Sequence, residues 1–255
     1  MDNLSIKQLE LIPWNKKYIS GPEVPPEPDP EEIPILIKLP FMKRDSKYLL
    51  FYTWLEIIRM VGSSEKKMKI LDAACGRGQI CQVLYFYGHD VTGADVMSYF
   101  GADKNIKFIQ CDLNETFPFE TNTFDIVINS TALHYLNSTE HFFSEAKRIL
   151  KTGGRIIFSI PNISNLSGRY YFFKTGRISE YSSAILARKN FLYPDYVFEL
   201  LTSKGFGIRS IKGVAPLINY KIRLFNLILG KWMFGNAGNE LKYSPVLIIE
   251  AVKQK

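Results

Sequence analysis

Cysteine is scarce in this chain. Its three copies, Cys75, Cys81 and Cys111, do not have the spacing of a metal site. An odd number of cysteines also argues against a disulfide framework, which small secreted domains use. The sequence therefore predicts no metal site and a reduced, cytoplasmic setting.

Long apolar runs are missing as well. No stretch approaches the roughly 18 consecutive apolar residues that a membrane-spanning helix needs. The first residues, MDNLSIKQLELIPWNKK, lack the basic stretch and apolar run of a signal peptide. An integral membrane protein is therefore not expected, although contact with a membrane surface stays open.

Charge is unevenly distributed over the 255 residues, whose net charge is +7. Acidic residues outnumber basic ones up to residue 150, and Lys and Arg dominate from residue 151 onward. A basic region attracts phosphate-bearing substrates or anionic membrane surfaces. Solvated lysines of a basic protein explain the same composition equally well.

The amino-terminal region has no regular apolar period. Prolines recur between Pro22 and Pro40, with acidic residues among them in EVPPEPDPEE. Proline interrupts helices and interior strands, so this stretch favours neither. We expect a proline-rich arm over residues 1–45 and one globular domain over residues 46–255.

Apolar strands and amphipathic helices alternate in the predicted domain. Helices are expected at 46–61, 79–88, 141–154 and 194–206, and Gly153 and Gly154 suit a left-handed cap of the third. Strands are expected at 69–74, 90–96, 106–112, 124–130, 155–162, 207–214 and 245–253. This alternation predicts an α/β fold with a mostly parallel sheet covered on both faces. Ligands of such folds bind beyond the carboxyl ends of the strands.

One loop carries the strongest signal, ILDAACGRGQI at residues 70–80. Gly76 and Gly78 follow a predicted strand, as in nucleotide-binding loops. A dinucleotide site would want a third glycine where Cys81 stands, and Asp72 would repel a pyrophosphate. A carboxylate beside a glycine turn suits a nucleoside that carries an amino group and no phosphate, such as S-adenosylmethionine.

Two further acids end the next two predicted strands. Asp95 is placed to accept the ribose hydroxyl protons, and Asp112 to accept an adenine amino proton. Met97 and Leu113 offer apolar cover for the ring. Three acids at the ends of successive strands therefore predict a single nucleoside site.

Five segments resemble motifs of the class I S-adenosylmethionine-dependent methyltransferases. They are ILDAACGRG, in which Ala74 replaces the usual first glycine, TGADV, FIQCDLNE, FDIVINSTALHYL and ILKTGGRIIFSIPN. The resemblance covers roughly residues 46–213, and PVLIIEAVK is similar to the last strand of the family. It implies a Rossmann-like, doubly wound sheet of seven strands, mostly parallel with an antiparallel last strand.

Carried onto this chain, the motifs imply a set of residues that hold the cofactor. These are Asp72, Ala74, Cys75, Gly76, Gly78, Asp95, Val96, Met97, Cys111, Asp112, Leu113 and Asn129. Asn129 would line the methionine end of S-adenosylmethionine, or it would simply cap its strand.

The carboxyl-terminal part resembles the branch with quinone-type O-methyltransferases and methyltransferases of glycans or lipid-linked sugars. The resemblance rests on SIPN, the aromatic and basic segment after it, and PDYVFELLTSKGF. Two features of that branch are absent: a histidine within residues 188–193, and a Glu-His pair after the fourth strand, where Leu133 and His134 stand. A metal-assisted mechanism is therefore not implied.

His134 is the best candidate for a general base, because an imidazole titrates near neutrality and follows the fourth strand. The alternative is a hydrogen-bonded histidine that begins the next helix. Tyr135 is a weaker candidate, for substrate contact.

Two insertions interrupt the alternation. Residues 163–193 contain RYYFFKTGR, in which Arg169, Tyr170 and Arg177 would form a lid that attracts an anionic acceptor; an aromatic stripe packed on the sheet edge is the alternative. Residues 215–244 contain a basic amphipathic segment that would contact a membrane or a lipid-linked substrate. Packing on its own domain or across a homodimer explains that segment as well.

The expected function is methyl transfer from S-adenosylmethionine to a hydroxyl or amine of a small molecule, a glycan or a lipid-linked sugar. An NAD(P)-dependent oxidoreductase is the first alternative, and Asp72 argues against it. A nucleic-acid methyltransferase is the second, but the sequence has no Asn-Pro-Pro-Tyr-type motif and no recognisable RNA-binding module, so no nucleic-acid partner is expected. A catalytically inactive cofactor-binding partner is the third.

Overall fold

The computed structural model describes most of the predicted domain. The described residues are 46–62, 66–98, 100–162, 165, 172–173, 175–176, 190, 192–214 and 244–254. The predicted arm at 1–45 and most of both insertions lie outside this set. No described helix is long and apolar enough to cross a membrane.

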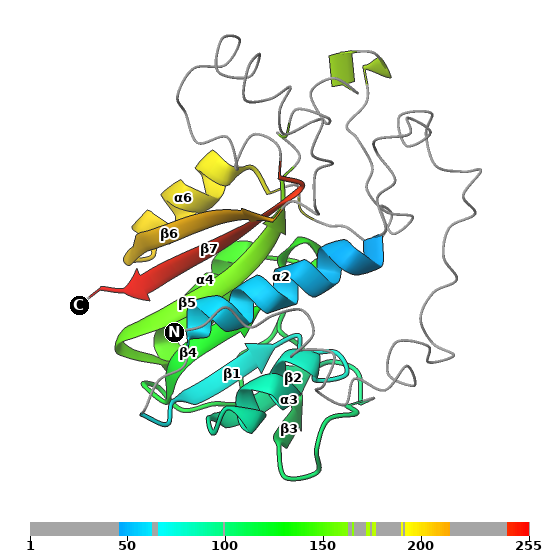
Figure 1. Ribbon diagram of the computed structural model, residues 1–255. Helices are drawn as coiled ribbons and strands as arrows, with labels where there is room; N and C mark the ends of the chain where they lie inside the picture. The colour runs from blue at the N-terminus through cyan, green and yellow to red at the C-terminus, as the bar shows by residue number, and fades with distance from the viewer. Residues whose placement is uncertain are drawn as a thin grey trace.

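Seven strands form one sheet in the order β3-β2-β1-β4-β5-β7-β6 (Figure 1). The strands are β1 (Lys69–Ala73), β2 (Asp90–Asp95), β3 (Lys107–Gln110), β4 (Phe124–Asn129), β5 (Leu150–Pro161), β6 (Phe206–Val214) and β7 (Val246–Lys253). Strands β1 to β5 pair in parallel, and β7 lies antiparallel between β5 and β6. The predicted fold class, including the antiparallel last strand, is confirmed.

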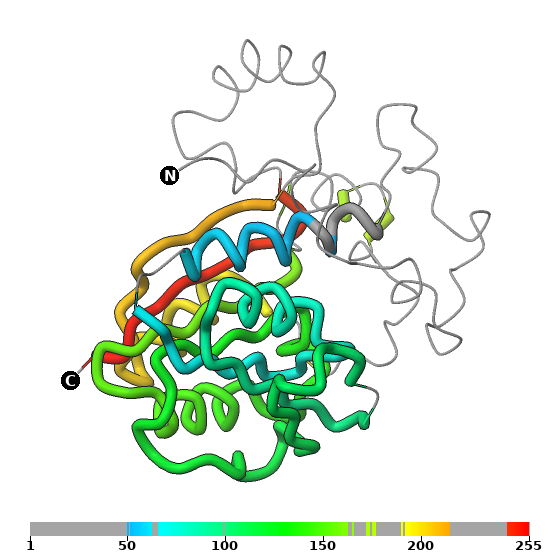
Figure 2. Tube along the Cα trace, turned by 60° about the horizontal axis from the view of Figure 1, so that its bottom comes forward, coloured from blue at the N-terminus to red at the C-terminus, as the bar shows by residue number. Residues whose placement is uncertain are grey.

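Helices cover both faces of the sheet (Figures 1 and 2). Helices α2 (Ser46–Val61) and α3 (Gln79–Phe86) lie on one face, and α4 (Thr139–Ile149) and α6 (Pro194–Ser203) on the other. Successive strand residues point to opposite faces, so Ile70 joins the core under α2 and α3 while Leu71 joins the core under α4 and α6. Burial on both faces explains why the inner strands β1, β4 and β7 are nearly continuous apolar runs.

The predicted helix at 141–154 is wrong at both ends. Helix α4 begins at Thr139, where the Ser138 hydroxyl accepts a hydrogen bond from the His141 amide, and it ends at Ile149. The buried Leu150 is extended and pairs with Phe124 of β4. Strand β5 therefore begins before Gly153 and Gly154, and these glycines do not end the helix. Gly153 does adopt a positive φ of 74°, but within β5.

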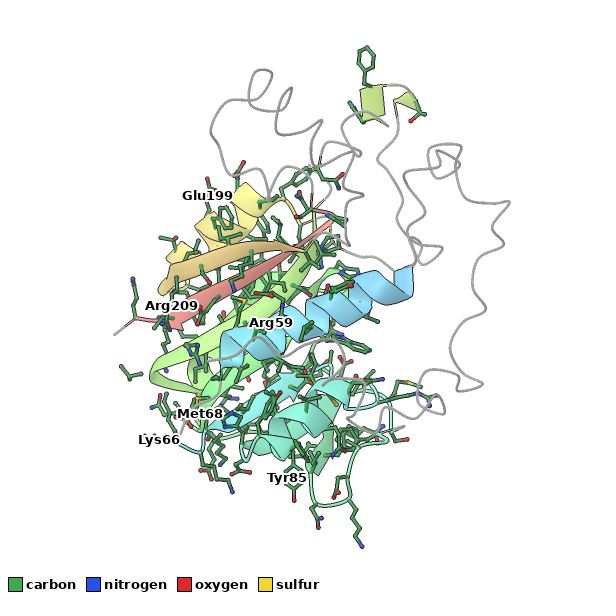
Figure 3. The ribbon with its side chains drawn as sticks, in the orientation of Figure 1. Arg59, Lys66, Met68, Tyr85, Glu199 and Arg209 are labelled. Carbon is green, nitrogen blue, oxygen red and sulfur yellow. The ribbon has the colours of Figure 1, made fainter. Side chains whose placement is uncertain are left out.

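A polar cluster connects α2 to the sheet. Arg155 of β5 donates to the Glu250 carboxylate of β7 over 2.7 Å and to the carbonyls of Met60 and Val61, at the end of α2, over 3.2 and 3.3 Å. Glu250 also receives a hydrogen bond from the Ser210 hydroxyl and a longer one, at 3.4 Å, from Arg209 of β6, which is labelled in Figure 3. The cluster therefore joins one helix to three neighbouring strands.

Candidate active site

The loop between β1 and α3 has an unusual backbone. Ala74, Gly76 and Gly78 all have positive φ, at 67°, 55° and 82°. The amides of Ala74 and Cys75 both donate to the Ala94 carbonyl, over 2.8 and 3.0 Å, which holds the loop against β2. A Cβ at position 78 would lie 2.4 Å from the Phe100 ring, so only glycine fits there. Nothing lies within 4 Å of where a Gly76 Cβ would stand, so the backbone at Gly76 is open to a ligand.

Asp95 connects this loop to the end of β2. One carboxylate oxygen accepts the Gly76 amide and the other accepts the Met97 amide, each over 2.9 Å. The side chain is buried, with 8% of the residue exposed. Each carboxylate oxygen can accept more than one hydrogen bond, so Asp95 retains acceptor capacity for a ligand hydroxyl.

Asp72 lies on β1 beneath the loop and is only 1% exposed. Its Oδ2 accepts a hydrogen bond from the Cys81 thiol over 3.4 Å, and its Oδ1 has no partner among the described residues. Burial raises the pKa of Asp72 to about 7, the thiol hydrogen bond lowers it, and repulsion from Asp95 raises it slightly. A buried carboxylate with one unpaired oxygen suits a cationic ligand.

The end of β4 adds two more acceptor atoms. The Asn129 amide donates to the Ala73 carbonyl over 3.0 Å, which is possible because β1 and β4 are adjacent and parallel. The Asn129 Oδ1 and the Ser130 hydroxyl are buried without partners among the described residues. Sequence reasoning did not single out Ser130; a polar residue directly after a strand of this sheet was the available signal.

The end of β3 comes next to β2, because the Cys111 amide donates to the Asp95 carbonyl over 2.9 Å. Asp112 is exposed, and its Oδ1 accepts two hydrogen bonds from Asn114. Burial raises the pKa of the Cys111 thiol to about 11. Leu113 packs in the core under α4, on the other face from α3.

Val96 and Met97 directly follow β2 and expose their side chains, at 54% and 48%. These exposed apolar side chains directly follow Asp95 and are available to cover a flat ring. Of the two residues proposed from sequence as ring cover, Met97 is therefore open to a ligand, whereas Leu113 is 4% exposed.

His134 lies in a short 3-10 helix, η3 (Leu133–Tyr135), which follows β4. Its ring is 4% exposed and packs 4.1 Å, between centroids, from the partly exposed ring of Tyr135. Its carbonyl accepts the Asn190 amide over 3.2 Å, so a described residue of the first insertion contacts η3. Arg169, Tyr170 and Arg177 lie outside the described residues.

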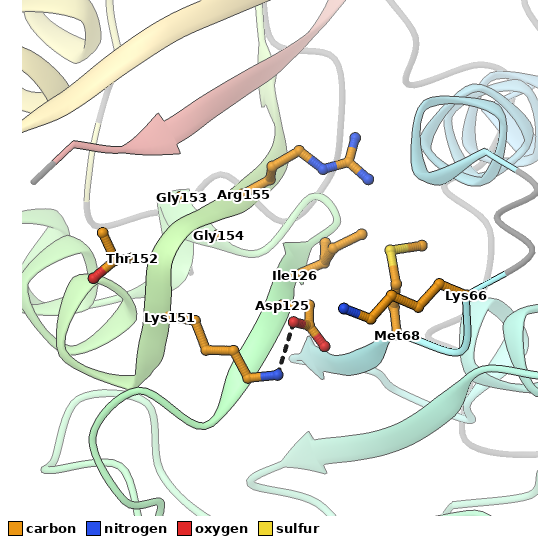
Figure 4. A pocket seen from close by; sticks show the side chains of 9 residues that line it. All are labelled: Lys66, Met68, Asp125, Ile126, Lys151, Thr152, Gly153, Gly154 and Arg155. Carbon is orange, nitrogen blue, oxygen red and sulfur yellow. Dashed lines mark hydrogen bonds and ion pairs between the residues drawn. The ribbon is translucent and has the colours of Figure 1, made fainter.

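A surface pocket at the opposite edge of the sheet is a poor alternative site (Figure 4). Its carboxylate, Asp125, is already paired with the Lys151 ammonium over 2.7 Å and with the Lys69 amide over 2.8 Å. It lies at the amino ends of β1 and β4, whereas ligands of parallel sheets bind at the carboxyl ends. No group of three or more acidic, histidine or cysteine side chains in the described part of the chain could hold a metal ion.

The structure thus brings the predicted residues of β1, its loop, β2, β3 and β4 to one edge of the sheet. Residues 71–158, which contain all of them, match a family model described as a methyltransferase domain. The fit to the cofactor rests on the unpaired Asp72 Oδ1 and Asn129 Oδ1 and on the open space at Gly76 in the loop.

Curated relatives point the same way. The chain is 27% identical, over 165 residues, to the mitochondrial ubiquinone biosynthesis O-methyltransferase of Rattus norvegicus, covering 58% of this chain and 46% of that protein. It is 24% identical to the ubiquinone biosynthesis O-methyltransferase of Rickettsia typhi, covering 71% and 74%. The chain spans about half the length of the mammalian relatives.

Solved structures share the fold. An S-adenosylmethionine-dependent methyltransferase from Archaeoglobus fulgidus aligns with a TM-score of 0.56 at 17% identity, covering 80% of this chain and 94% of that one. The matched domain, the strand order and the relatives agree: residues 71–158 match a methyltransferase domain, and the chain is similar in fold and sequence to S-adenosylmethionine-dependent methyltransferases.

Proposed function

We propose that this chain transfers the methyl group of S-adenosylmethionine to a hydroxyl or amine of a small molecule, a glycan or a lipid-linked sugar. The observation that carries the proposal is the unpaired, buried Asp72 Oδ1, which calls for a donor that bears positive charge. The amino group of the cofactor is such a donor, and a pyrophosphate is not.

Different residues of the site would bind different parts of the cofactor. Asp72 and the Asn129 Oδ1 would bind the amino acid part, Asp95 the ribose hydroxyls, and Asp112 with Val96 and Met97 the adenine. The turn between β1 and α3 has positive φ at Ala74, Gly76 and Gly78, and the cofactor would approach its backbone at Gly76. Cys75, Cys111 and Leu113 would contribute through their backbone or as support beneath the site.

Bound S-adenosylmethionine supplies a methyl group already activated on a sulfonium. The protein therefore has mainly to hold the acceptor atom close to that methyl group and in line with the departing sulfur. For a hydroxyl acceptor, His134 would remove the proton, a contribution of about 10²–10⁴-fold in rate. Tyr135, whose side chain is partly exposed beside His134, would contact the acceptor, as would Arg169, Tyr170 and Arg177.

The O-methyltransferase relatives support a hydroxyl acceptor more than an amine. We further propose that residues 46–255 form the catalytic domain with residues 1–45 as an arm, and that the protein acts in the cytoplasm. The basic segment within 215–244 would contact a membrane surface, a lipid-linked acceptor or a second copy of the chain.

Calorimetry on the purified protein tests the proposal. S-Adenosylhomocysteine, the demethylated product, should bind, and Asp95→Ala should weaken that binding at least tenfold because the Gly76 and Met97 amides lose their shared acceptor. NADH should give no heat. Tight NADH binding without any S-adenosylhomocysteine binding would overturn the proposal in favour of an oxidoreductase.

A further inference from the structure

Cys81 occupies a position that the proposed function leaves unexplained. It lies in the first turn of α3, three residues after Gly78, and is fully buried. Its thiol donates to Asp72 Oδ2 over 3.4 Å, so the two oxygens of this carboxylate differ. One is held by a side chain of the protein, and the other, Oδ1, has no partner among the described residues.

The backbone around the thiol fixes this contact. Gly93 of β2 lies beside Asp72 in the parallel register, and a Cβ at position 93 would stand 3.2 Å from the Cys81 sulfur and 2.9 Å from the Cys75 sulfur. The missing side chain at Gly93 therefore makes room for both sulfurs. Strands β1 and β2 and helix α3 together confine the Cys81 thiol next to Asp72.

We infer that Cys81 is a positioning residue of the cofactor site: its thiol holds Oδ2 of Asp72, so that Oδ1 is the oxygen offered to the amino group of the cofactor. The inference rests on the proposed function, because it concerns how Asp72 meets the amino acid part of S-adenosylmethionine. Cys81 itself need not touch the ligand.

The thiol has a second effect, on the charge of Asp72. A hydrogen bond donated to the ionised carboxylate favours that form, whereas burial and the neighbouring Asp95 oppose it. Besides Asp95, the other titratable group near the pair is the Cys75 thiol from the loop. The Cys81 side chain thus both orients Asp72 and favours its charged state.

Two ligands separate this role from a general loss of structure. S-Adenosylhomocysteine carries the amino acid group, and 5′-methylthioadenosine is the same nucleoside thioether without it. Cys81→Ala should weaken the binding of S-adenosylhomocysteine about 5- to 20-fold. The substitution removes a hydrogen bond to a charged group, but the lost donor is a weak one, a thiol. It should change 5′-methylthioadenosine binding less than twofold.

Matched variants complete the experiment. Cys81→Ser keeps a donor and should retain S-adenosylhomocysteine affinity to within about threefold. Val83→Ala removes buried volume from the same helix without touching a polar contact, and should alter neither affinity. If Cys81→Ala fails to fold, Cys81→Ser still tests the inference. Its hydroxyl is a stronger donor and favours ionised Asp72, so S-adenosylhomocysteine affinity should fall at a lower pH than in the wild type.

The outcomes are distinct. Equal affinities of wild type and Cys81→Ala for S-adenosylhomocysteine, or equal losses for both ligands, would overturn the positioning role and leave the proposed function intact. A serine variant with the pH profile of the wild type would also contradict it. A wild-type protein that binds neither ligand would instead refute the proposed function itself.

Discussion

At the scale of single residues, Asp72 connects the proposed function to stability. Its pKa is about 7 in the folded protein against 3.8 in the reference state, so the folded form holds a proton more tightly than the unfolded form. Ionising Asp72 therefore destabilises the fold progressively as the pH rises from about 4 to about 7, and fully above that. The penalty is on the order of 4 kcal/mol as an upper limit.

The first prediction follows from this sign. Without cofactor at pH 8, Asp72→Asn should have a higher free energy of unfolding than the wild type, because the buried charge is gone. At pH 4 the difference should nearly vanish. Chemical denaturation at the two pH values, followed by circular dichroism, measures it, and the same variant should lose S-adenosylhomocysteine affinity at pH 8.

Asp125 provides the control with opposite sign. Lys151 and the Lys69 amide lower the pKa of Asp125 in spite of its partial burial, so its ionised form stabilises the fold above the unfolded pKa. Asp125→Asn should therefore lower stability slightly at pH 8, by less than about 1 kcal/mol for so exposed a pair. If both variants changed stability in the same direction, burial would not be what sets the pKa of Asp72.

How far sequence predicted the site can be seen in the same residues. Asp72 and Asp95 could be predicted as strand-end acids, because a glycine turn and an alternating pattern place strand ends without further information. The unpaired state of Asp72 Oδ1 could not be predicted from the sequence. It depends on the parallel register with Gly93 and on how α3 brings Cys81 to the carboxylate. Contacts between elements are not encoded in the period of any one element.

At the scale of secondary-structure elements, the Arg155–Glu250 cluster makes the second prediction. Glu250→Ala should destabilise the protein by up to about 3–5 kcal/mol, because it leaves the partly buried Arg155 guanidinium, which contacts the end of α2, without its carboxylate. Arg209→Ala is the matched control. The Arg209 side chain is 60% exposed and lies 3.4 Å from the Glu250 carboxylate, so its loss should lower the free energy of unfolding by less than about 1 kcal/mol.

Thermal and denaturant unfolding of the two variants at neutral pH measures this difference. Equal effects of the two substitutions would mean that Glu250 acts as a surface charge and that α2 does not depend on the cluster. A Glu250→Gln variant should fall between the two, because it keeps a hydrogen-bond acceptor for Arg155 but not the charge.

The elements themselves were largely predictable. Helix α3 and strands β1, β2 and β4 begin where sequence periodicity placed them, because each carries an apolar run that turn residues end. Helix α4 was misplaced because glycine is a local signal for a helix end, whereas the pairing of Leu150 with Phe124 is a tertiary one. The expected strand at 106–112 is shortened to β3, and the Asp112 carboxylate accepts the Asn114 amide in the turn that follows.

At the scale of the whole molecule, the third prediction concerns the predicted arm. Among the described residues, both apolar cores draw their buried side chains from positions 57 to 251. We predict that this core folds without residues 1–45. A shortened chain that begins at residue 46 should unfold cooperatively, with a midpoint within a few degrees of the full chain. Its affinity for S-adenosylhomocysteine should agree within about twofold.

Differential scanning calorimetry and ligand titration of the two chains make the comparison. A shortened chain that binds 5′-methylthioadenosine but not S-adenosylhomocysteine would place part of the arm over the amino acid end of the site. A shortened chain that does not fold would contradict the predicted boundary.

The reversed direction of β7 has a practical consequence. Because Val246 pairs with Pro161 and Val252 with Arg155, the chain runs back along β5 and finishes beside that strand's amino end. Lys253 reaches the Leu150 carbonyl there, across the sheet's full height from Asp72, Asp95 and Asn129. An affinity tag, a fluorophore or a surface tether attached after Lys253 would lie at the opposite end of the strands from the proposed cofactor site, which suits immobilised screening of acceptor libraries.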